Sequence, residues 1–188
     1  MDKIKILKTE HCDSRTIKSP FTKAEVFSDT IKHVCAVYDV AQALAYTFVD
    51  RCSAHDWTKM DKRHFDNFYE CMKHSVETGE DFTKSTWYKD HITLERHHPA
   101  SHCVEDINLL DILEMCIDVT VAGLARAGKV TVPELSPGVL ETAMKNTINL
   151  IASSIEVVEG EEEETKLIDR LTLGKESNDS IIDIKGNN

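Results

Sequence analysis

Apolar residues recur every three or four positions over most of the chain, which is the spacing of one face of an α-helix. The longest such stretch runs from Phe27 to Cys52 and follows Thr-Lys-Ala-Glu, in which Thr22 and Glu25 form a capping box. The pattern predicts a long helix over about 23–53 with one apolar face. Its heptad-like spacing is compatible with a homodimer seam and equally with a core face.

Four more segments show helical spacing, and their ends carry the usual start and stop residues. Asp61 is an N-cap candidate, and Gly79 and Gly128 each follow the last apolar position of a segment. Pro99 ends another segment, and Ser136 followed by proline opens the last one. The predicted helices are about 61–78, about 84–97, about 103–127, and a last one that extends to Ile155.

The two ends of the chain differ from this helical middle. Residues 1–21 are polar and mixed, and two isoleucines near the start indicate a short strand or arm. Residues 159–188 open with EGEEEE and hold nine acidic and four basic residues, which is typical of a solvated, mobile tail. A short strand at residues 181–184, packed against the N-terminal arm, is the alternative for the end of this tail.

The predicted fold class is therefore all-α, with about five to seven helices around one core in residues 22–158, between an N-terminal arm and a loose acidic tail. The 188 residues are enough for one such domain. Seven glycines and four prolines are few for an all-β fold, which needs many tight turns.

The composition excludes several classes of partner. A net charge of -11, from 33 acidic and 22 basic residues, argues against nucleic-acid polymers and membrane surfaces. Apolar runs fall far short of the about 18 residues that cross a bilayer, and no signal peptide is visible. The six cysteines lack C-x2-C spacing, so free thiols are expected. We expect a cytoplasmic protein.

The candidate chemistry begins with three carboxylates and an excess of histidine. Asp111, Glu114 and Asp118 fall at i, i+3 and i+7, on one face of their predicted helix and beside its apolar stripe. Because unpaired buried carboxylates cost several kcal/mol, a cation is expected to face them. Seven of the nine histidines lie within residues 55–102.

Two histidines and two carboxylates form the predicted ligand set. His33 lies beside the apolar face of the long helix, and His55-Asp56 follows this helix, where irregular backbone lets both side chains reach one ion. With Asp118 or Asp111 they offer two imidazoles and two carboxylates, which suits Mn, Fe, Co, Mg or Zn with open positions for water and substrate. Such an ion lowers the pKa of bound water and binds phosphate oxygens.

The order His, then His-Asp, then Asp on successive helices resembles the HD-domain metal-dependent phosphohydrolases over about residues 22–156. A closer likeness is to small HD-like proteins of phages and bacteria. It rests on four motifs in the expected order: HDWTK (55–59), WYKDH (87–91), ERHHP (95–99) and EMCID (114–118). The resemblance implies an HD-domain-like helical bundle in which one or two divalent ions are bound by His33, His55, Asp56 and Asp118.

The resemblance also implies a phosphohydrolase that cleaves a nucleotide or related small phosphate ester through a metal-activated water. Monoester, diester and pyrophosphate cleavage all stay open. Lys59 stands where several HD hydrolases carry a glutamate, so we predict Glu114 as acid/base and Lys59 as a phosphate contact. His91, His97 and His98 are predicted to bind a second ion or phosphate. Because neighbouring residues do not share a helix face, at most one of the last two is expected to reach the site, unless the helix has already ended at Pro99.

Plainer interpretations compete with these. Asp111 is expected to be a solvated edge residue rather than a ligand, and Trp87 and Tyr88 are expected in the core rather than stacked on a base. Two other functions stay open. One is a protein that sequesters a nucleotide or signalling molecule without turnover, which Lys59 favours. The other is an interaction protein whose acidic tail docks on a basic partner.

Overall fold

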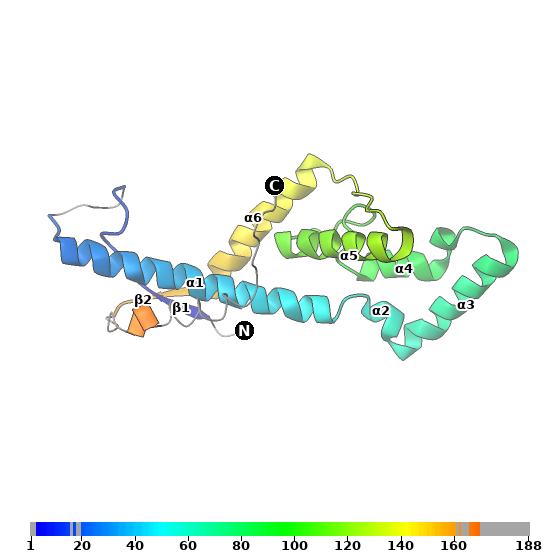
Figure 1. Cartoon of the computed structure of the whole chain (residues 1–188), viewed down its shortest axis with the longest axis horizontal. Coiled ribbons are helices and arrows are strands. Elements are labelled where there is room, and N and C mark those ends of the chain that lie inside the picture. The colour runs from blue at the N-terminus through cyan, green and yellow to red at the C-terminus, as the bar shows by residue number, and fades with distance from the viewer. Residues whose placement is uncertain (1–2, 16, 18–19, 161, 163–165, 170–188) are drawn as a thin grey trace. The chain divides into compact units, whose positions relative to one another are not determined.

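Helices α1 to α6 dominate the fold, as the sequence predicts, and the all-α prediction with five to seven helices is confirmed (Figure 1). The computed structural model describes residues 3–15, 17, 20–160, 162 and 166–169. In chain order the elements are β1 (Ile4–Leu7), α1 (Lys23–Ser53), α2 (Trp57–Met60), α3 (Lys62–Thr78), the 3₁₀ helix η1 (Phe82–Lys84), α4 (Thr86–Leu94), α5 (Leu109–Ala127), α6 (Pro137–Ser154) and β2 (Ile155–Val158). No helix in the described part of the chain has the length and hydropathy to cross a membrane.

The ends of α1 and α3 follow from local side-chain signals. The Thr22 amide donates to Glu25 Oε2 at 2.6 Å, and the Glu25 amide donates to Thr22 Oγ1 at 3.2 Å, which completes the predicted capping box. Asp61 caps α3, and Gly79 ends it with φ 77°, a conformation that glycine adopts without strain. Both predicted helices are confirmed within a residue or two.

Three other predicted boundaries are wrong. Helix α4 ends at Leu94 rather than near 97, so the following histidines lie in a loop. Helix α5 begins only at Leu109, because the Asn108 side chain and Asp111 form a capping box there. Helix α6 ends at Ser154, and Ile155 opens a strand instead of closing the helix.

The contacts between residues divide the chain into two compact units. Unit 1 consists of Met1–Ala45 and Ile151–Asn188, and unit 2 of Tyr46–Leu150. Unit 1 thus combines both ends of the chain, so its limits do not coincide with the arm, domain and tail expected from composition.

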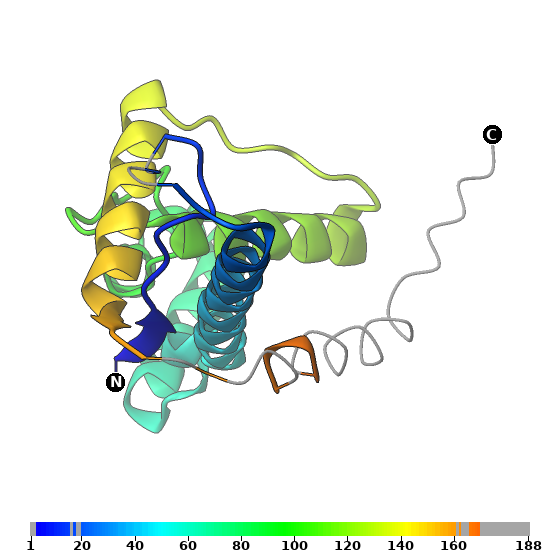
Figure 2. The same ribbon diagram turned by 90° about the vertical axis from the view of Figure 1, so that its left-hand side faces the viewer.

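Two parallel strands join the chain ends in unit 1. Ile4 of β1 lies opposite Ile155 of β2, and Leu7 lies opposite Val158 (Figures 1 and 2). The predicted N-terminal strand is therefore confirmed, but its partner is the segment after α6. The strand suggested at residues 181–184 lies outside the described residues.

Part of the predicted acidic tail packs against α1. Leu167 is 1% exposed and forms a buried cluster with Ile31 and Cys35. The Cys35 thiol also donates to the Leu167 carbonyl at 3.4 Å. The expectation of a solvated segment is wrong at Leu167, because this apolar residue completes the core of unit 1, while its neighbours 166, 168 and 169 are exposed.

Asp29 of α1 is a buried carboxylate that holds the chain after β1. Its Oδ2 accepts from the amides of Glu10 and His11 at 2.7 and 2.8 Å, and Lys32 Nζ lies 3.2 Å from its Oδ1. Burial disfavours the charged form, but these hydrogen bonds outweigh it and keep the pKa of Asp29 below its ordinary value.

We expect Asp29→Asn to lower the free energy of unfolding by about 1–3 kcal/mol at neutral pH, because two partly buried backbone amides lose a charged acceptor. Since the folded-state pKa is depressed, this contribution is present above the unfolded pKa of about 3.9 and is lost as the pH falls below it. Urea denaturation at neutral pH and near pH 3 measures the difference, with the exposed Asp50→Asn as control. An equal loss at both pH values would contradict the assignment.

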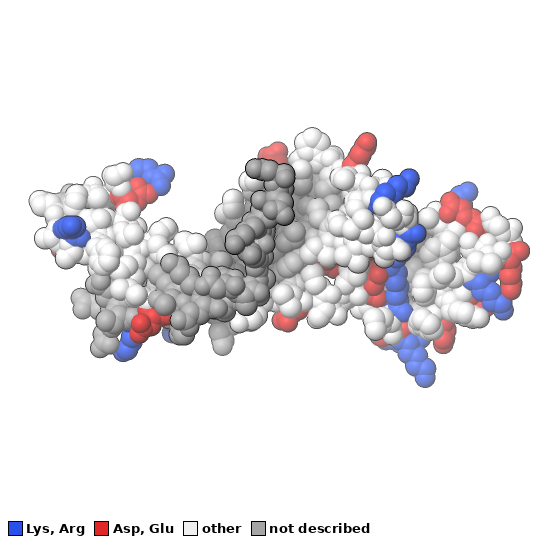
Figure 3. Space-filling view, in the orientation of Figure 1, with Lys and Arg blue, Asp and Glu red and all other residues white. Residues whose placement is uncertain are grey.

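Unit 2 is built around aromatic contacts between α3, η1 and α4. The ring centroid of Trp87 lies 4.4 Å from that of Phe68 and 5.7 Å from that of Phe82. Trp87 is 2% exposed, so its predicted place in the core is confirmed. Basic and acidic side chains are interspersed on the face that Figure 3 shows.

Candidate metal centre

The backbone leaves helical geometry where the sequence places His55-Asp56. Helix α1 ends at Ser53, and Asp56 adopts φ 58° and ψ 29°, the left-handed region that few residues other than glycine occupy. His55 Nε2 consequently lies 3.5 Å from Asp56 Oδ2. The predicted irregular helix end is confirmed, and that both side chains bind one ion stays a prediction.

The second source of candidate ligands is the segment from the last turn of α4 into the loop after it. His91 Nε2 lies 2.9 Å from His98 Nε2 and 3.5 Å from Asp56 Oδ1, and His97 Nε2 lies 3.6 Å from the same oxygen. Both His97 and His98 reach the cluster, which is the exception expected for a helix that has already ended, because α4 ends at Leu94 and loop backbone brings both in.

These distances are close to those between two ligands of a single ion. Two atoms that each lie about 2.1 Å from a metal, at the angles of tetrahedral or octahedral coordination, are about 3.0–3.4 Å apart. One ligand atom from each of four residues fits within 4.8 Å of the others: Asp56, His91, His97 and His98. A second group with the same property shares one histidine with the first: His55, His97 and Asp118.

Three polar atoms in this cluster are buried without a hydrogen-bond partner in the described structure. They are Asp56 Oδ1 and both ring nitrogens of His97. Each buried polar atom without a hydrogen-bond partner lowers the stability of the folded protein by about 1–3 kcal/mol. Three such atoms at one place therefore indicate that a further group binds them. The residues present therefore fit a metal ion, which would satisfy Asp56 Oδ1 and one His97 nitrogen directly.

Hydrogen bonds around His91 determine which of its nitrogens carries the proton. Thr58 Oγ1 donates its single proton to Glu95 Oε1 at 2.8 Å, and the Thr58 amide donates to the same oxygen at 2.9 Å. Thr58 Oγ1 must then accept from His91 Nδ1, which lies 2.7 Å away. His91 Nε2 is left with a lone pair towards the cluster, the form in which imidazole binds a metal.

Electrostatics favour the same protonation states. Burial, aided by the charges of His98 and Lys59, lowers the pKa of His91 to about 3, and burial near His97 lowers that of His98 to about 4. Burial opposes ionisation of Asp56, but its ion pair with Lys59 keeps the pKa of Asp56 below its ordinary value. At neutral pH His91 and His98 are thus uncharged and Asp56 is a carboxylate, which are the metal-binding forms.

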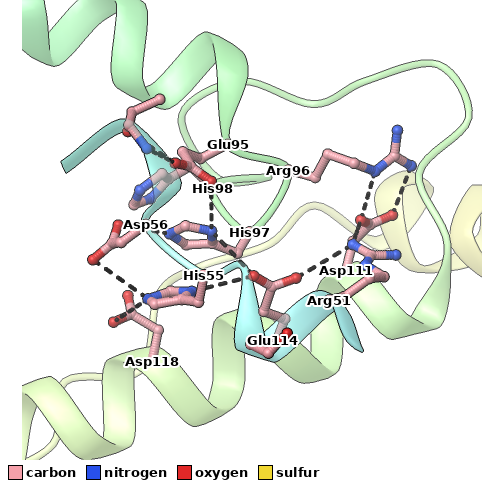
Figure 4. Close-up of polar contacts among 12 residues, drawn as sticks. Arg51, His55, Asp56, Glu95, Arg96, His97, His98, Asp111, Glu114 and Asp118 are labelled. Atoms are coloured by element: carbon pink, nitrogen blue, oxygen red, sulfur yellow. Dashed lines mark hydrogen bonds and ion pairs between the residues drawn. The ribbon is translucent and has the colours of Figure 1, made fainter. Parts of the chain in front are cut away.

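Glu114 supports the histidines from behind. Its Oε1 lies 3.2 Å from His55 Nδ1 and 3.4 Å from His97 Nδ1, and its Oε2 lies 3.3 Å from Arg51 (Figure 4). Burial alone would raise its pKa, but the close contacts with His97 and His55 and the charge of Arg51 bring the pKa of Glu114 below its ordinary value. With both oxygens engaged, Glu114 is placed to orient the two rings, which differs from its predicted role as acid/base.

The prediction that Asp111 is a solvated edge residue is wrong. Asp111 is 0% exposed, and Arg96 contacts its two oxygens at 2.8 and 2.9 Å (Figure 4). Arg51 bonds to the same carboxylate and reaches Glu114 beyond it. Two guanidinium groups occupy Asp111, so it supports the centre and belongs to neither group of candidate ligands.

The remaining predicted residues fall in different places. His33 is exposed on α1 in unit 1 and belongs to neither group of candidate ligands among the described residues, so its role as a ligand stays a prediction. Lys59 lies at the cluster through Asp56. Sequence reasoning did not assign roles to four residues that support the centre: Arg51, Thr58, Glu95 and Arg96. Three of them were inside the motifs HDWTK and ERHHP, which was the available signal.

Two pockets open onto this centre. One, of about 380 Å³, runs along α5 and is lined by His55, Ile117 and Val121. The other, of about 440 Å³, is lined by histidines of the cluster and by aromatic residues of α3, η1 and α4. Asp118 and Arg126 line both pockets, so a ligand of the centre would meet these two side chains from either side.

The model of DUF5662, a family of unknown function, matches residues 22–168. The chain belongs to this family. The matched range of the DUF5662 chain begins at the capping box of α1, ends just after the buried Leu167, and includes every residue of the candidate centre. No curated protein and no solved structure matches the chain.

Proposed function

We propose that the protein is a metal-dependent phosphohydrolase that acts on a small phosphate ester. The proposal assigns the divalent ion to four ligands: Asp56, His91, His97 and His98. The observation that supports it is the convergence of these side chains around buried atoms that lack a hydrogen-bond partner in the described structure. Three nitrogens and one carboxylate oxygen suit Zn, Mn, Fe or Co, and leave positions for water and substrate.

A bound ion would supply Lewis acidity and lower the pKa of a water molecule. The chain supplies charge and orientation. Lys59 brings an ammonium group beside the ligand Asp56, where phosphate oxygens would lie. Asp118, whose side chain is 25% exposed, faces His55 Nε2 at 3.4 Å and lines both pockets. Outside the proposed ligand set it is the most exposed carboxylate of the centre, and we assign it the orientation of the water molecule.

Binding without turnover is the second candidate, and one observation favours it. The carboxylate expected to act as acid/base, Glu114, is engaged by His55, His97 and Arg51, and its side chain is only 8% exposed. A centre in which Asp118 does not activate water would hold a phosphate ester without cleaving it. Turnover is therefore the measurement that separates the two candidates.

The test combines metal analysis with a phosphate-release screen of monoesters, diesters and pyrophosphates in Mn, Co or Zn. We expect bound metal in the purified protein and a fall in melting temperature with chelator. An ion at 100 times its Kd stabilises the folded state by about 2.7 kcal/mol. His97→Ala is expected to abolish both metal binding and phosphate release, because His97 belongs to both groups of ligands.

His102→Ala is the matched control, since His102 is an exposed histidine in the same loop. It should keep the metal and the activity of the wild type. Absence of metal, together with no effect of chelator on melting, would overturn the metal centre. Bound metal with no release from any ester would instead favour the sequestering protein.

A further inference from the structure

The larger of the two pockets beside the metal centre has an aromatic wall and a cationic rim. Phe68 of α3, Phe82 of η1 and two residues of α4, Trp87 and Tyr88, form the wall. Its volume of about 440 Å³ falls in the range of sites that take small molecules. Cluster histidines line one side of it, so a molecule in the pocket would touch the centre.

The aromatic wall is held in place from behind. The Trp87 ring is stacked on His91 with an interplanar angle of 13° and a centroid distance of 4.8 Å, and it is almost fully buried. Phe82 packs against Trp87 and also lies 5.9 Å from Tyr88, yet both Phe82 and Tyr88 keep part of their surface exposed. A rigid, partly open aromatic surface of this kind suits a planar ring.

The rim carries a cation whose charge is not used elsewhere. Arg126 is exposed, and no carboxylate among the described residues lies within ion-pair distance of it, although it lines both pockets. Arg51 and Arg96 are, by contrast, both bound to Asp111. A guanidinium with free donors beside a metal centre matches the oxygens of a phosphate, which it contacts in a bidentate manner.

We propose that this pocket binds the organic part of the substrate, that this part contains a planar aromatic ring of nucleobase size, and that Arg126 holds the phosphate against the metal centre. The proposal deepens the phosphohydrolase assignment and rests on it. In the hydrolysis, water oxygen bonds to phosphorus while the bond from phosphorus to the ester oxygen breaks. The departing alcohol takes up a proton, so the products are the alcohol and phosphate.

Charge and chemistry argue against other occupants. A cationic ligand would meet Lys59 and Arg126 at the rim, which disfavours it. A purely aliphatic phosphate ester would reach Arg126 but leave the aromatic wall unused. The ring is therefore what distinguishes the proposed substrate from other phosphate esters.

A comparison of two substrates tests the ring. In Phe82→Leu, which keeps an apolar side chain of similar size, kcat/KM for 4-nitrophenyl phosphate should fall about 5- to 150-fold, the range measured for loss of one stacking ring. For glycerol phosphate the same variant should change kcat/KM by less than about 2-fold. Phe65→Leu, on the neighbouring helix α3 and outside the pocket lining, is the control. Equal losses on both substrates would overturn the proposal.

Arg126→Gln should lower kcat/KM for both substrates by the same factor, because the phosphate is common to them. A loss confined to the aromatic ester would contradict the assignment of Arg126 to phosphate. The metal content of Arg126→Gln should match that of the wild type, since Arg126 belongs to neither ligand group.

A binding measurement keeps the inference testable without turnover. The chain has two tryptophans, so Trp57→Phe leaves Trp87 as the one fluorescent reporter, at the pocket wall. Titration of this metal-loaded protein with adenosine 5′-monophosphate should give a saturable change in emission, and ribose 5-phosphate should give none. The same result without any hydrolysis would retain the ring site while the phosphohydrolase assignment fails. No change with adenosine monophosphate, or an equal change with ribose phosphate, would overturn the ring site.

Discussion

Replacing Asp111 with alanine is expected to lower the free energy of unfolding by about 3–5 kcal/mol, as measured for buried ion pairs that lose one partner. Asp111 is fully buried, and its carboxylate neutralises two guanidinium groups, those of Arg51 and Arg96. It also accepts from the Asn108 amide at 2.8 Å as part of the α5 capping box. Removal would leave two cations without their anion and would weaken the start of α5.

Asp106→Ala is a matched control, because Asp106 binds the same Arg96 at 2.8 Å from a side chain that is 78% exposed. An exposed pair of this kind contributes about 0–1 kcal/mol. Urea denaturation of both variants measures the difference between one buried and one exposed carboxylate on the same arginine. Equal losses of unfolding free energy in the two variants would show that the buried ion pairs of Asp111 do not stabilise this region more than an exposed pair does.

Asp111→Ala should also weaken metal binding. Arg51 bridges Asp111 and Glu114, and Glu114 orients His55 and His97. Outer contacts of this type change metal affinity by about 10- to 100-fold when they are removed. Isothermal titration with Mn²⁺ under conditions where Asp111→Ala is folded should therefore show a weaker Kd than in Asp106→Ala.

Helix boundaries were predictable from the sequence at α1 and α3, whose caps are local, although the equally local capping box of Asn108 and Asp111 at the start of α5 was missed. The capping box of Thr22 and Glu25 marks the start of α1. Asp61 marks the start of α3 and Gly79 its end. These signals act through local hydrogen bonds. The end of α4 was not predictable, since Glu95 lies beyond the helix and accepts from Thr58, 37 positions away. The helical spacing of apolar residues continues past Leu94 in the sequence. The helix nevertheless ends there, and the next residue, Glu95, accepts the hydrogen bonds from Thr58.

The candidate site was predictable to the extent that it depends on short motifs. His55-Asp56 follows a strong helix signal, so its irregular backbone and convergent side chains could be expected. The use of both His97 and His98 was expected only as an exception, because face arguments for helices do not apply to the loop in which they lie. The role of Asp111 depends on arginines 60 and 15 positions away, which no local pattern relates to it.

Asp56→Asn is expected to separate metal affinity from stability. Asparagine also tolerates the left-handed backbone conformation of Asp56, so the local fold should persist. Because a charged ligand becomes a neutral amide, the Kd for Mn²⁺ or Zn²⁺ should rise by at least about 100-fold. Phosphate release should fall in parallel if the proposed activity depends on this ion.

In the metal-free protein, Asp56→Asn should preserve or increase thermal stability rather than lower it. Asp56 Oδ1 lies 3.6 Å from His97 Nε2, and both atoms are buried without hydrogen-bond partners. A neutral amide costs less to bury than a carboxylate, and its NH₂ group can donate to that nitrogen. The melting temperature in chelator should therefore be equal to or higher than that of the wild type, while the rise on adding metal disappears.

Asp118→Asn is the paired measurement that decides which group of ligands holds the ion. Asp118 belongs only to the group with His55 and His97, so its replacement should change metal affinity by less than about 10-fold when the ion lies at Asp56. The same variant should still lower phosphate release, because Asp118 is assigned to the water. If instead Asp118→Asn removes the metal and Asp56→Asn retains it, the ion belongs beside His55, and the first ligand group is wrong.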